Sequence, residues 1–170
     1  MDFESKIISR EITAESCTGG RIAEAIISMP GASKYFKGGI ISYVNEVKES
    51  LLGVSHDILM EKTAVCEDVA VSMVKGACKT LCTDYAIAAT GIAGPSGGSP
   101  GIPVGTIWLA CGSRDKGGTY KVEEDHGRDI NLAIATNKAL QMFLDFLKGE
   151  SADAENADAT EVSKKEGIAE

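Results

Sequence analysis

The apolar run DYAIAAT at residues 84–90 constrains the fold more than any other stretch of this sequence. A strand with one face in water alternates apolar and polar residues, whereas this run is apolar at nearly every position, as expected of a buried central strand. It follows a longer helical pattern, EDVAVSMVKGACKTL, at residues 67–81. The sequence therefore predicts a buried strand that directly follows a helix.

Strand and helix patterns alternate along the rest of the chain. We expect further strands at residues 11–16, 38–44, 104–112 and 119–125, the last two joined as a hairpin through SRDKGG. We expect further helices at residues 21–29, 45–53 and 128–148. Asn45 is the expected N-cap of the second of these helices, and Gly53 its C-terminal cap. This order predicts an α/β domain with layers of helices around a mixed sheet.

Length and composition predict one ordered domain followed by a tail. The chain has 170 residues, 44% of them apolar, which suits a single domain over residues 1–148. Residues 149–170 contain seven acidic residues and two lysines, which account for five of the eight net negative charges. This segment has almost no large apolar side chains, so we expect an acidic disordered tail there.

The same composition excludes several classes of function. The domain has no basic stripe, which argues against nucleic acid as a partner. No apolar run approaches the length of a membrane span, and the charged start MDFESKIISRE lacks a signal-peptide pattern. We therefore expect a cytoplasmic protein with no membrane partner. Five cysteines without a CxxC pair predict reduced thiols. Neither of the two histidines belongs to a cluster of metal ligands, so we expect no structural metal site.

The first candidate site is the turn in TAESCTGGRIAEA, residues 13–25, where a strand gives way to a helix. Backbone N–H groups are free at such a helix start, and the glycines let a ligand approach them closely. Ser16 and Cys17 are two possible nucleophiles just before Gly19 and Gly20. From spacing alone, a turn capped by Ser or Thr is the more common structure, so the pattern leaves both interpretations open.

Two further segments contain groups of chemical interest. In the segment YVNEVK, Tyr43 ends a strand and Lys48 lies one turn into the next helix. Lysine becomes a general base when burial lowers its pKa, although most lysines are simply exposed. The loop GIAGPSGGSPGIP, residues 91–103, leaves the C-terminal end of the buried strand, where α/β sheets usually bind ligands. An SxxK pattern, from Ser113 to Lys116, falls in a hairpin turn, and we interpret it as chance.

Together and in this order, these motifs resemble the CinA C-terminal domain family. The resemblance rests on AESCTGG (14–20), PGASKYFKGGIISYVNEVKESLLGV (30–54), AVCEDVAVSMVKGA (64–77), ATGIAGPSGG (89–98) and PVGTIWLA (103–110). It covers about residues 11–148, and its stand-alone members are nicotinamide-nucleotide amidohydrolases. It implies a three-layer α/β/α sandwich, a homodimer and no metal or organic cofactor.

The resemblance also implies a reaction and a set of residues. The implied reaction is hydrolysis of the carboxamide of nicotinamide mononucleotide, a small-molecule substrate, to nicotinate mononucleotide and ammonia. The implied catalytic residues are Ser16 as nucleophile, Lys48 as base, and Tyr43. The oxyanion and substrate contacts expected around them are Thr18, Gly19, Gly20, Asn45, Thr90, Gly91, Gly94, Gly97, Gly98 and Arg128.

The sequence departs from the family pattern in three places. The segment before AESCTGG is short, Cys66 replaces the usual serine of AVS, and Leu132 stands where a second arginine is usual after Arg128. Two alternatives stay open at this point. One is an amidase acting on another nucleotide-like amide, and the other is a non-catalytic nucleotide-binding or assembly module.

Overall fold

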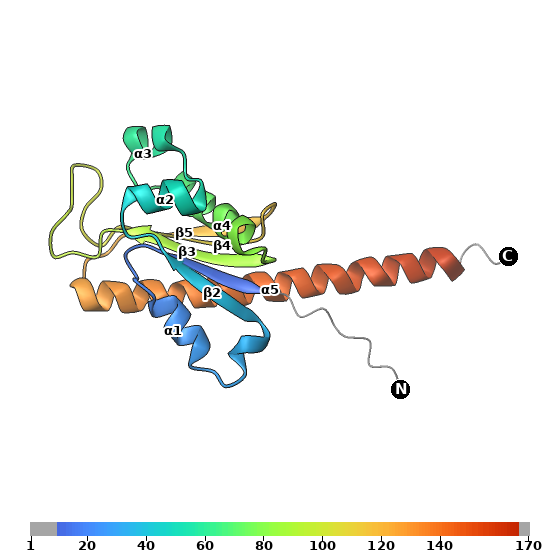
Figure 1. Cartoon of the computed structure of the whole chain (residues 1–170). Coiled ribbons are helices and arrows are strands. Elements are labelled where there is room, and N and C mark those ends of the chain that lie inside the picture. The colour runs from blue at the N-terminus through green and yellow to red at the C-terminus, as the bar shows by residue number, and fades with distance from the viewer. Residues whose placement is uncertain (1–9, 167–170) are drawn as a thin grey trace.

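A five-stranded mixed sheet forms the centre of the protein (Figure 1). The computed structural model describes the backbone of residues 10–166 and the side chains of residues 10–154. The strands lie in the order β2-β1-β3-β4-β5; β2, β1 and β3 are parallel, and β4 is antiparallel to both of its neighbours. Their bounds are β1 Glu11–Glu15, β2 Phe36–Ile41, β3 Tyr85–Gly91, β4 Ile107–Gly112 and β5 Gly117–Val122.

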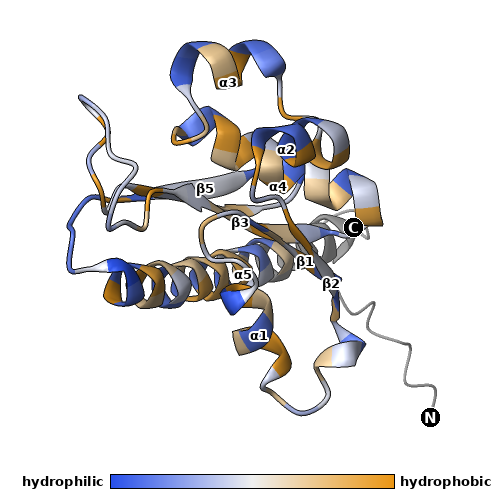
Figure 2. Cartoon of the chain, turned by 60° about the vertical axis from the view of Figure 1, so that its left-hand side comes forward, coloured by the Kyte–Doolittle hydropathy of each residue, from blue (hydrophilic) through white to orange (hydrophobic). Residues whose placement is uncertain are grey.

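Helices cover both faces of the sheet, which makes a three-layer α/β/α arrangement. One layer contains α1 (Arg21–Ile27) and α5 (Arg128–Glu166), and the other contains α2 (Asn45–Leu52), α3 (His56–Lys62) and α4 (Glu67–Leu81). Figure 1 shows these layers with the sheet nearly edge-on, and Figure 2 shows the sheet between α4 and α5 from another side. The predicted fold class is therefore confirmed. Within the described residues, no helix is both long enough and apolar enough to cross a membrane.

The central strand β3 explains why the DYAIAAT run lacks polar alternation. Ala86 and Ala88 pack into the core on the side of α4, and Ile87 and Ala89 pack into the core on the side of α5. Successive side chains on a strand point to opposite faces, so a strand with helices on both sides needs apolar residues at every position. The prediction of a buried central strand is confirmed.

Most predicted elements are present, with small shifts at their ends. The helix predicted at 67–81 has the bounds of α4, and the β4–β5 hairpin is confirmed. The strand predicted at 38–44 lies earlier, at β2, and the first helix ends at Ile27. Neither α3 nor the short 3₁₀ helix Ala32–Lys34 was predicted, because neither is long enough to show a clear helical spacing of apolar residues.

The predicted caps of α2 have different outcomes. Gly53 ends the helix in the left-handed conformation, at φ 63°, as predicted. Asn45 is not the N-cap: Val44 takes that position, no side chain caps the helix, and Asn45 is the first helical residue.

The acidic segment after Lys148 is helical where the sequence analysis predicted disorder. Helix α5 continues without a break to Glu166 and extends beyond the edge of the sheet (Figure 1). Residues 149–166 are rich in Ala, Glu and Lys, which have high helix propensity, and propensity favours helix even where packing does not. An ion pair joins Glu150 to Lys116 in the hairpin turn. The last four residues of the predicted tail lie outside the described residues.

Candidate active site

A cleft opens where β1 and β3 end and α5 begins. It has a volume of about 230 Å³, and its lining residues are Ser16, Cys17, Tyr43, Gly91, Ile92, Ala93, Gly94, Ser96 and Arg128. Because β1 and β3 are parallel, their carboxyl ends meet at one edge of the sheet, where α/β proteins usually bind ligands. The three segments singled out from the sequence thus contribute to one cleft.

Ser16, which lines this cleft, is hydrogen-bonded to Lys48, which is buried and does not line it. Nζ of Lys48 lies 3.0 Å from Oγ of Ser16. Ser16 directly follows β1, and Lys48 lies on α2, one turn after the helix begins. The parallel pairing of β1 with β2 brings the chain leaving β2 beside the end of β1, which places α2 next to Ser16. The distance is within hydrogen-bond reach, as a nucleophile and its base require.

The surroundings of Lys48 suit a neutral amine that accepts a proton. Its Nζ also lies 2.8 Å from the carbonyl oxygen of Ser42 and 3.4 Å from that of Tyr43. A neutral amine has two N–H donors and one lone pair. If the two carbonyls accept both donors, the lone pair is left to accept the proton of the Ser16 hydroxyl.

Burial also favours the neutral form of Lys48. The residue is only 1% exposed, and this burial lowers the pKa of its ammonium group below the ordinary value. A negative charge on Cys17 would act in the opposite direction. However, burial raises the pKa of the Cys17 thiol to about 12, so this thiol is uncharged near neutral pH. Desolvation is therefore the dominant effect on Lys48.

Tyr43 lies at the rim of the cleft rather than beside the amine. Tyr43 is 61% exposed, and it contacts the Lys48 amine through its backbone carbonyl. The sequence analysis expected the tyrosine to act in catalysis with Lys48. The structure places its side chain among the cleft-lining residues, but it shows no hydrogen bond from the Tyr43 hydroxyl to the Ser16–Lys48 pair.

The turn after Ser16 places backbone N–H groups near its hydroxyl. Gly19 and Gly20 adopt positive φ values of 58° and 105°, which the turn into α1 requires and which favour glycine. The N–H of Gly19 is bonded back to the carbonyl of Ser16. Within the described part of the chain, neither the N–H of Thr18 nor that of Gly20 donates to an oxygen. The Thr18 N–H lies beside the sulfur of Cys17, which is a weak acceptor, so both N–H groups are candidates to stabilise an oxyanion.

The loop after β3 is held against the start of α5. Arg128 donates a 2.7 Å hydrogen bond to the carbonyl of Gly94, and the buried Asn131 donates a 3.0 Å hydrogen bond to that of Ala93. Asn131 also donates to Asp125 and accepts the N–H of His126. One nitrogen of the Arg128 guanidinium thus fixes the loop, which leaves its other N–H groups for a ligand in the cleft.

Three residues in or beside the cleft were not predicted from the sequence: Ser96, Glu15 and Asn131. Ser96 lies within the predicted loop, so its presence in the lining follows from the loop itself. Glu15 and Asn131 act through contacts with residues that are distant in sequence, for which the sequence offers no pattern.

Besides Thr18, Gly19 and Gly20 of the turn, four residues predicted to contact substrate do not line the cleft. The Thr90 hydroxyl donates to the carbonyl of Ala64, which ties β3 to the segment before α4. Asn45 begins α2, and Gly97 and Gly98 lie in the loop beyond Ser96 without lining the cleft. These four residues have positions consistent with a role in folding.

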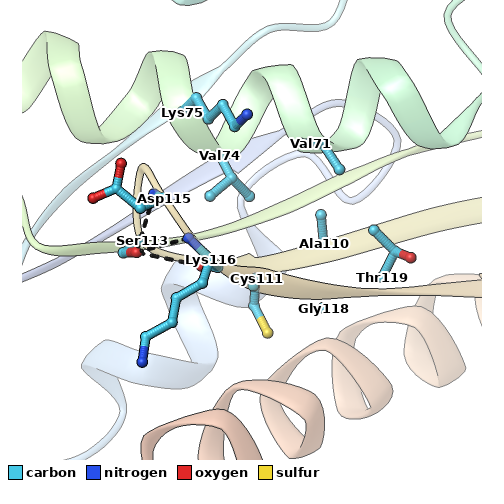
Figure 3. A pocket seen from close by; sticks show the side chains of 11 residues that line it. Val71, Val74, Lys75, Ala110, Cys111, Ser113, Asp115, Lys116, Gly118 and Thr119 are labelled. Atoms are coloured by element: carbon cyan, nitrogen blue, oxygen red, sulfur yellow. Dashed lines mark hydrogen bonds between the residues drawn. The ribbon is translucent and has the colours of Figure 1, made fainter. Parts of the chain in front are cut away.

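The SxxK pattern from Ser113 to Lys116 does not form a serine–lysine pair. Oγ of Ser113 accepts the backbone N–H groups of Asp115 and Lys116, and the Lys116 ammonium pairs with Glu150. Figure 3 shows this turn beside a cavity of about 150 Å³ between α4 and the β4–β5 hairpin, with the Lys116 side chain directed away from Ser113. Within the residues whose side chains are described, no three His, Cys, Asp or Glu side chains are grouped so that they could hold a metal ion.

Comparisons with known proteins agree on one family. The CinA C-terminal domain model matches residues 8–147. The chain is 44% identical over 130 residues to the nicotinamide-nucleotide amidohydrolase PncC of Escherichia coli, which covers 76% of this chain and 79% of that protein. It is 42% identical over 130 residues to a CinA-like protein of Thermosipho melanesiensis, covering 76% of this chain but only 32% of that protein. The chain therefore spans about a third of the length of such CinA-like relatives.

Solved structures show the same similarity. A CinA superfamily protein from Escherichia coli matches with a TM-score of 0.76 and 35% identity, over 79% of this chain and 78% of that chain. A competence/damage inducible protein from Agrobacterium tumefaciens matches with a TM-score of 0.74 and 36% identity, over 79% of this chain and 84% of that chain.

Proposed function

Because the chain belongs to the CinA C-terminal domain family, we propose that it hydrolyses the carboxamide of nicotinamide mononucleotide to nicotinate mononucleotide and ammonia. The main support from the structure is the 3.0 Å hydrogen bond between the buried Lys48 and Ser16, which lines the cleft. A buried lysine bonded to a serine at a strand-to-helix turn suits acyl transfer by nucleophilic catalysis. Arg128, a cation in the lining of the same cleft, suits a substrate with a phosphate group.

In the proposed first half-reaction, Ser16 attacks the carboxamide carbon and Lys48 accepts the hydroxyl proton. The N–H groups of Thr18 and Gly20 stabilise the oxyanion of the tetrahedral intermediate. Lys48 then donates its proton to the departing nitrogen, which leaves as ammonia. An ester between Ser16 and the nicotinoyl group remains.

In the second half-reaction, water attacks this ester and Lys48 accepts the proton of the water. Collapse of the second tetrahedral intermediate releases the carboxylate, and the proton returns to Oγ of Ser16. The positive pyridinium ring withdraws electrons from the carboxamide, so this substrate is more electrophilic than an ordinary amide. A serine–lysine pair without a third residue therefore suffices in this proposal.

Ammonia release tests the proposal directly. Purified protein is incubated with nicotinamide mononucleotide, with its riboside and with nicotinamide, and the Ser16→Ala variant serves as control. We expect ammonia from the mononucleotide, less from the riboside and none from the Ser16→Ala variant. If the wild-type protein binds the mononucleotide without releasing ammonia, the chain is a binding module and the proposed function is wrong.

The homodimer and the cytoplasmic location also belong to this proposal. The homodimer follows from the resemblance, and the cytoplasmic location follows from the composition of the sequence. Sedimentation of the purified chain tests the first, and cell fractionation tests the second.

A further inference from the structure

Glu15 is a buried carboxylate placed directly before the proposed nucleophile. It is the last residue of β1 and only 1% exposed. One carboxylate oxygen accepts the N–H of Ile22 at 2.9 Å, and the other accepts the N–H of Ala23 at 3.0 Å. Both donors belong to the first turn of α1, so Glu15 bonds to a helix that begins six residues after it.

These two hydrogen bonds replace an ordinary helix cap. The first N–H groups of a helix have no partner within the helix, and a side chain at the N-cap usually accepts one of them. Here Gly20 occupies the N-cap and no side chain bonds from that position. A buried carboxylate is costly unless it is well hydrogen-bonded, and hydrogen bonds to a charged acceptor are stronger than neutral ones. The Glu15 carboxylate and the start of α1 therefore stabilise each other.

The bonds also close a loop around the reacting groups. The segment between Glu15 and Ile22 contains Ser16 and the N–H groups of Thr18 and Gly20. Its two ends are joined through the carboxylate, and inside it Gly19 is bonded to Ser16 and Arg21 to Thr18. The nucleophile and the free N–H groups thus have fixed relative positions, as stabilisation of an oxyanion requires.

We propose that Glu15 is a positioning residue for acyl transfer, which holds Ser16 and the N–H groups of Thr18 and Gly20 in reactive geometry by accepting the N–H groups of Ile22 and Ala23. This inference rests on the proposed function for the identity of the substrate but not for the reactivity of Ser16. Glu15 does not touch substrate, because it is only 1% exposed and both of its carboxylate oxygens are bonded to α1.

The test compares Glu15→Gln with Glu24→Gln. Glutamine keeps one acceptor oxygen but turns an amide group toward the second N–H, so one of the two hydrogen bonds is lost. Glu24 is exposed in the first turn of the same helix, so its variant removes an equal charge near the same N–H groups. The measured quantities are kcat and KM for nicotinamide mononucleotide, and the rate at which phenylmethanesulfonyl fluoride modifies Ser16, followed by mass spectrometry.

We expect Glu15→Gln to lower both kcat and the modification rate by at least about tenfold, because small displacements of reacting groups cause large losses of rate. KM should change little, since Arg128 is untouched, and Glu24→Gln should behave as wild type. All rates are measured well below the melting temperature of each variant. Under that condition a residue that only stabilises the fold would leave kcat and the modification rate unchanged, and this outcome would overturn the proposal.

Glu15→Asp keeps the test decisive if Glu15→Gln does not fold. Aspartate keeps the charge but is one methylene shorter, so it cannot reach both N–H groups, and the same tenfold losses are expected. Wild-type reactivity in this variant would overturn the proposal. If the wild-type protein fails to release ammonia but Ser16 modification still depends on Glu15, the proposed function is wrong and the positioning role stands.

Discussion

Ser16 and Lys48 form a 3.0 Å hydrogen bond although they lie 32 positions apart in the sequence. Parallel strands create this contact. Glu15 at the end of β1 is paired with Ile41 at the end of β2, and the carbonyl of Glu15 then accepts the N–H of Ser42. Ser16 and Lys48 therefore lie in segments that leave neighbouring strand ends, and the backbone carbonyl of Ser42 supplies an acceptor for the Lys48 amine.

The protonation state of Lys48 should control the pH dependence of the reaction. Burial lowers the pKa of this lysine, and only the neutral amine accepts the serine proton. Below the lowered pKa, kcat/KM should rise about tenfold per pH unit, and it should level off above that pKa, before the ordinary lysine value of about 10.4 is reached. A rate that is flat with pH from 5 to 9 would contradict the role of base.

Lys48→Arg should be at least about a hundredfold less active, because arginine stays protonated and cannot act as a base. The charge is kept, so an electrostatic role alone would survive this change. The measurement is kcat/KM for nicotinamide mononucleotide, with circular dichroism as the check on folding. Substantial activity in this variant would assign the base to another group, with Tyr43 the first to examine.

Alanine substitution should change the activity differently at Ser16 and at Cys17. Ser16→Ala should lose at least about a thousandfold in kcat, while nicotinamide mononucleotide still binds. Cys17→Ala should keep most of the activity, because burial raises the pKa of this thiol to about 12 and the thiol rather than the reactive thiolate is present. Kinetics together with a binding measurement checks both variants. An inactive Cys17→Ala beside an active Ser16→Ala would reverse the assignment.

The sequence predicts those features that repeat along a helix or a strand. The DYAIAAT run predicts β3 because burial on both faces requires apolar residues at every position, and the apolar spacing at 67–81 predicts α4. The segment at 149–166 is different, because its composition suits both a disordered chain and an extended helix. Only propensity favours the helix that the structure has there.

Site features that depend on contacts between distant segments could not be predicted in this way. Spacing alone could not distinguish Ser16 from Cys17 and did not pair Lys48 with the Ser42 carbonyl, because both depend on strand order. The resemblance implied a catalytic role for Tyr43, whereas only its backbone carbonyl contacts the Lys48 amine. Glu15 accepts the N–H of Ile22 in α1, seven residues further along the chain, and this contact matches no local capping pattern.

Arg128 should act on substrates with a phosphate group. Arg128→Ala should raise KM for nicotinamide mononucleotide at least about tenfold, the size expected for loss of one charged contact, and should leave KM for the riboside nearly unchanged. Arg114→Ala is a matched control, because Arg114 also donates to a backbone carbonyl, that of Cys78, but lies in the hairpin turn. Equal increases in KM for both substrates would show that Arg128 serves only to hold the loop through Gly94.

Removal of residues 149–170 should leave both fold and activity intact. The side chains described between Gly149 and Asp153 are mostly exposed, and the ion pair from Glu150 to Lys116 is a surface contact. Such exposed pairs contribute little to stability, so the melting temperature should fall by only about 1–2 °C. Lys116→Ala in the full-length chain removes the ion pair alone and should give the same small shift. A larger fall on truncation would show that the helical extension packs on the domain.

Glu11, at the start of β1, should make stability depend on pH in the weakly acidic range. Burial raises the pKa of its carboxyl from 4.5 to about 6, so the folded protein binds this proton more tightly than the unfolded chain does. The stabilisation from this proton is complete below pH 4.5 and is lost as the pH rises to about 6. Above that pH, Glu11 lowers the free energy of unfolding by at most about 2 kcal/mol, and by about 1 kcal/mol once solvent screening of a partly buried group is considered.

Glu11→Gln removes the ionisable group and should therefore raise the melting temperature at pH 8 by about 2–4 °C, with no difference from wild type near pH 4. Thermal unfolding of both proteins across this pH range measures the effect. Glu61→Gln is the control, because Glu61 is exposed on α3 and should not change the pH profile. If the two melting curves stay equal at pH 8, the Glu11 carboxylate is solvated in the folded protein and its burial does not affect stability.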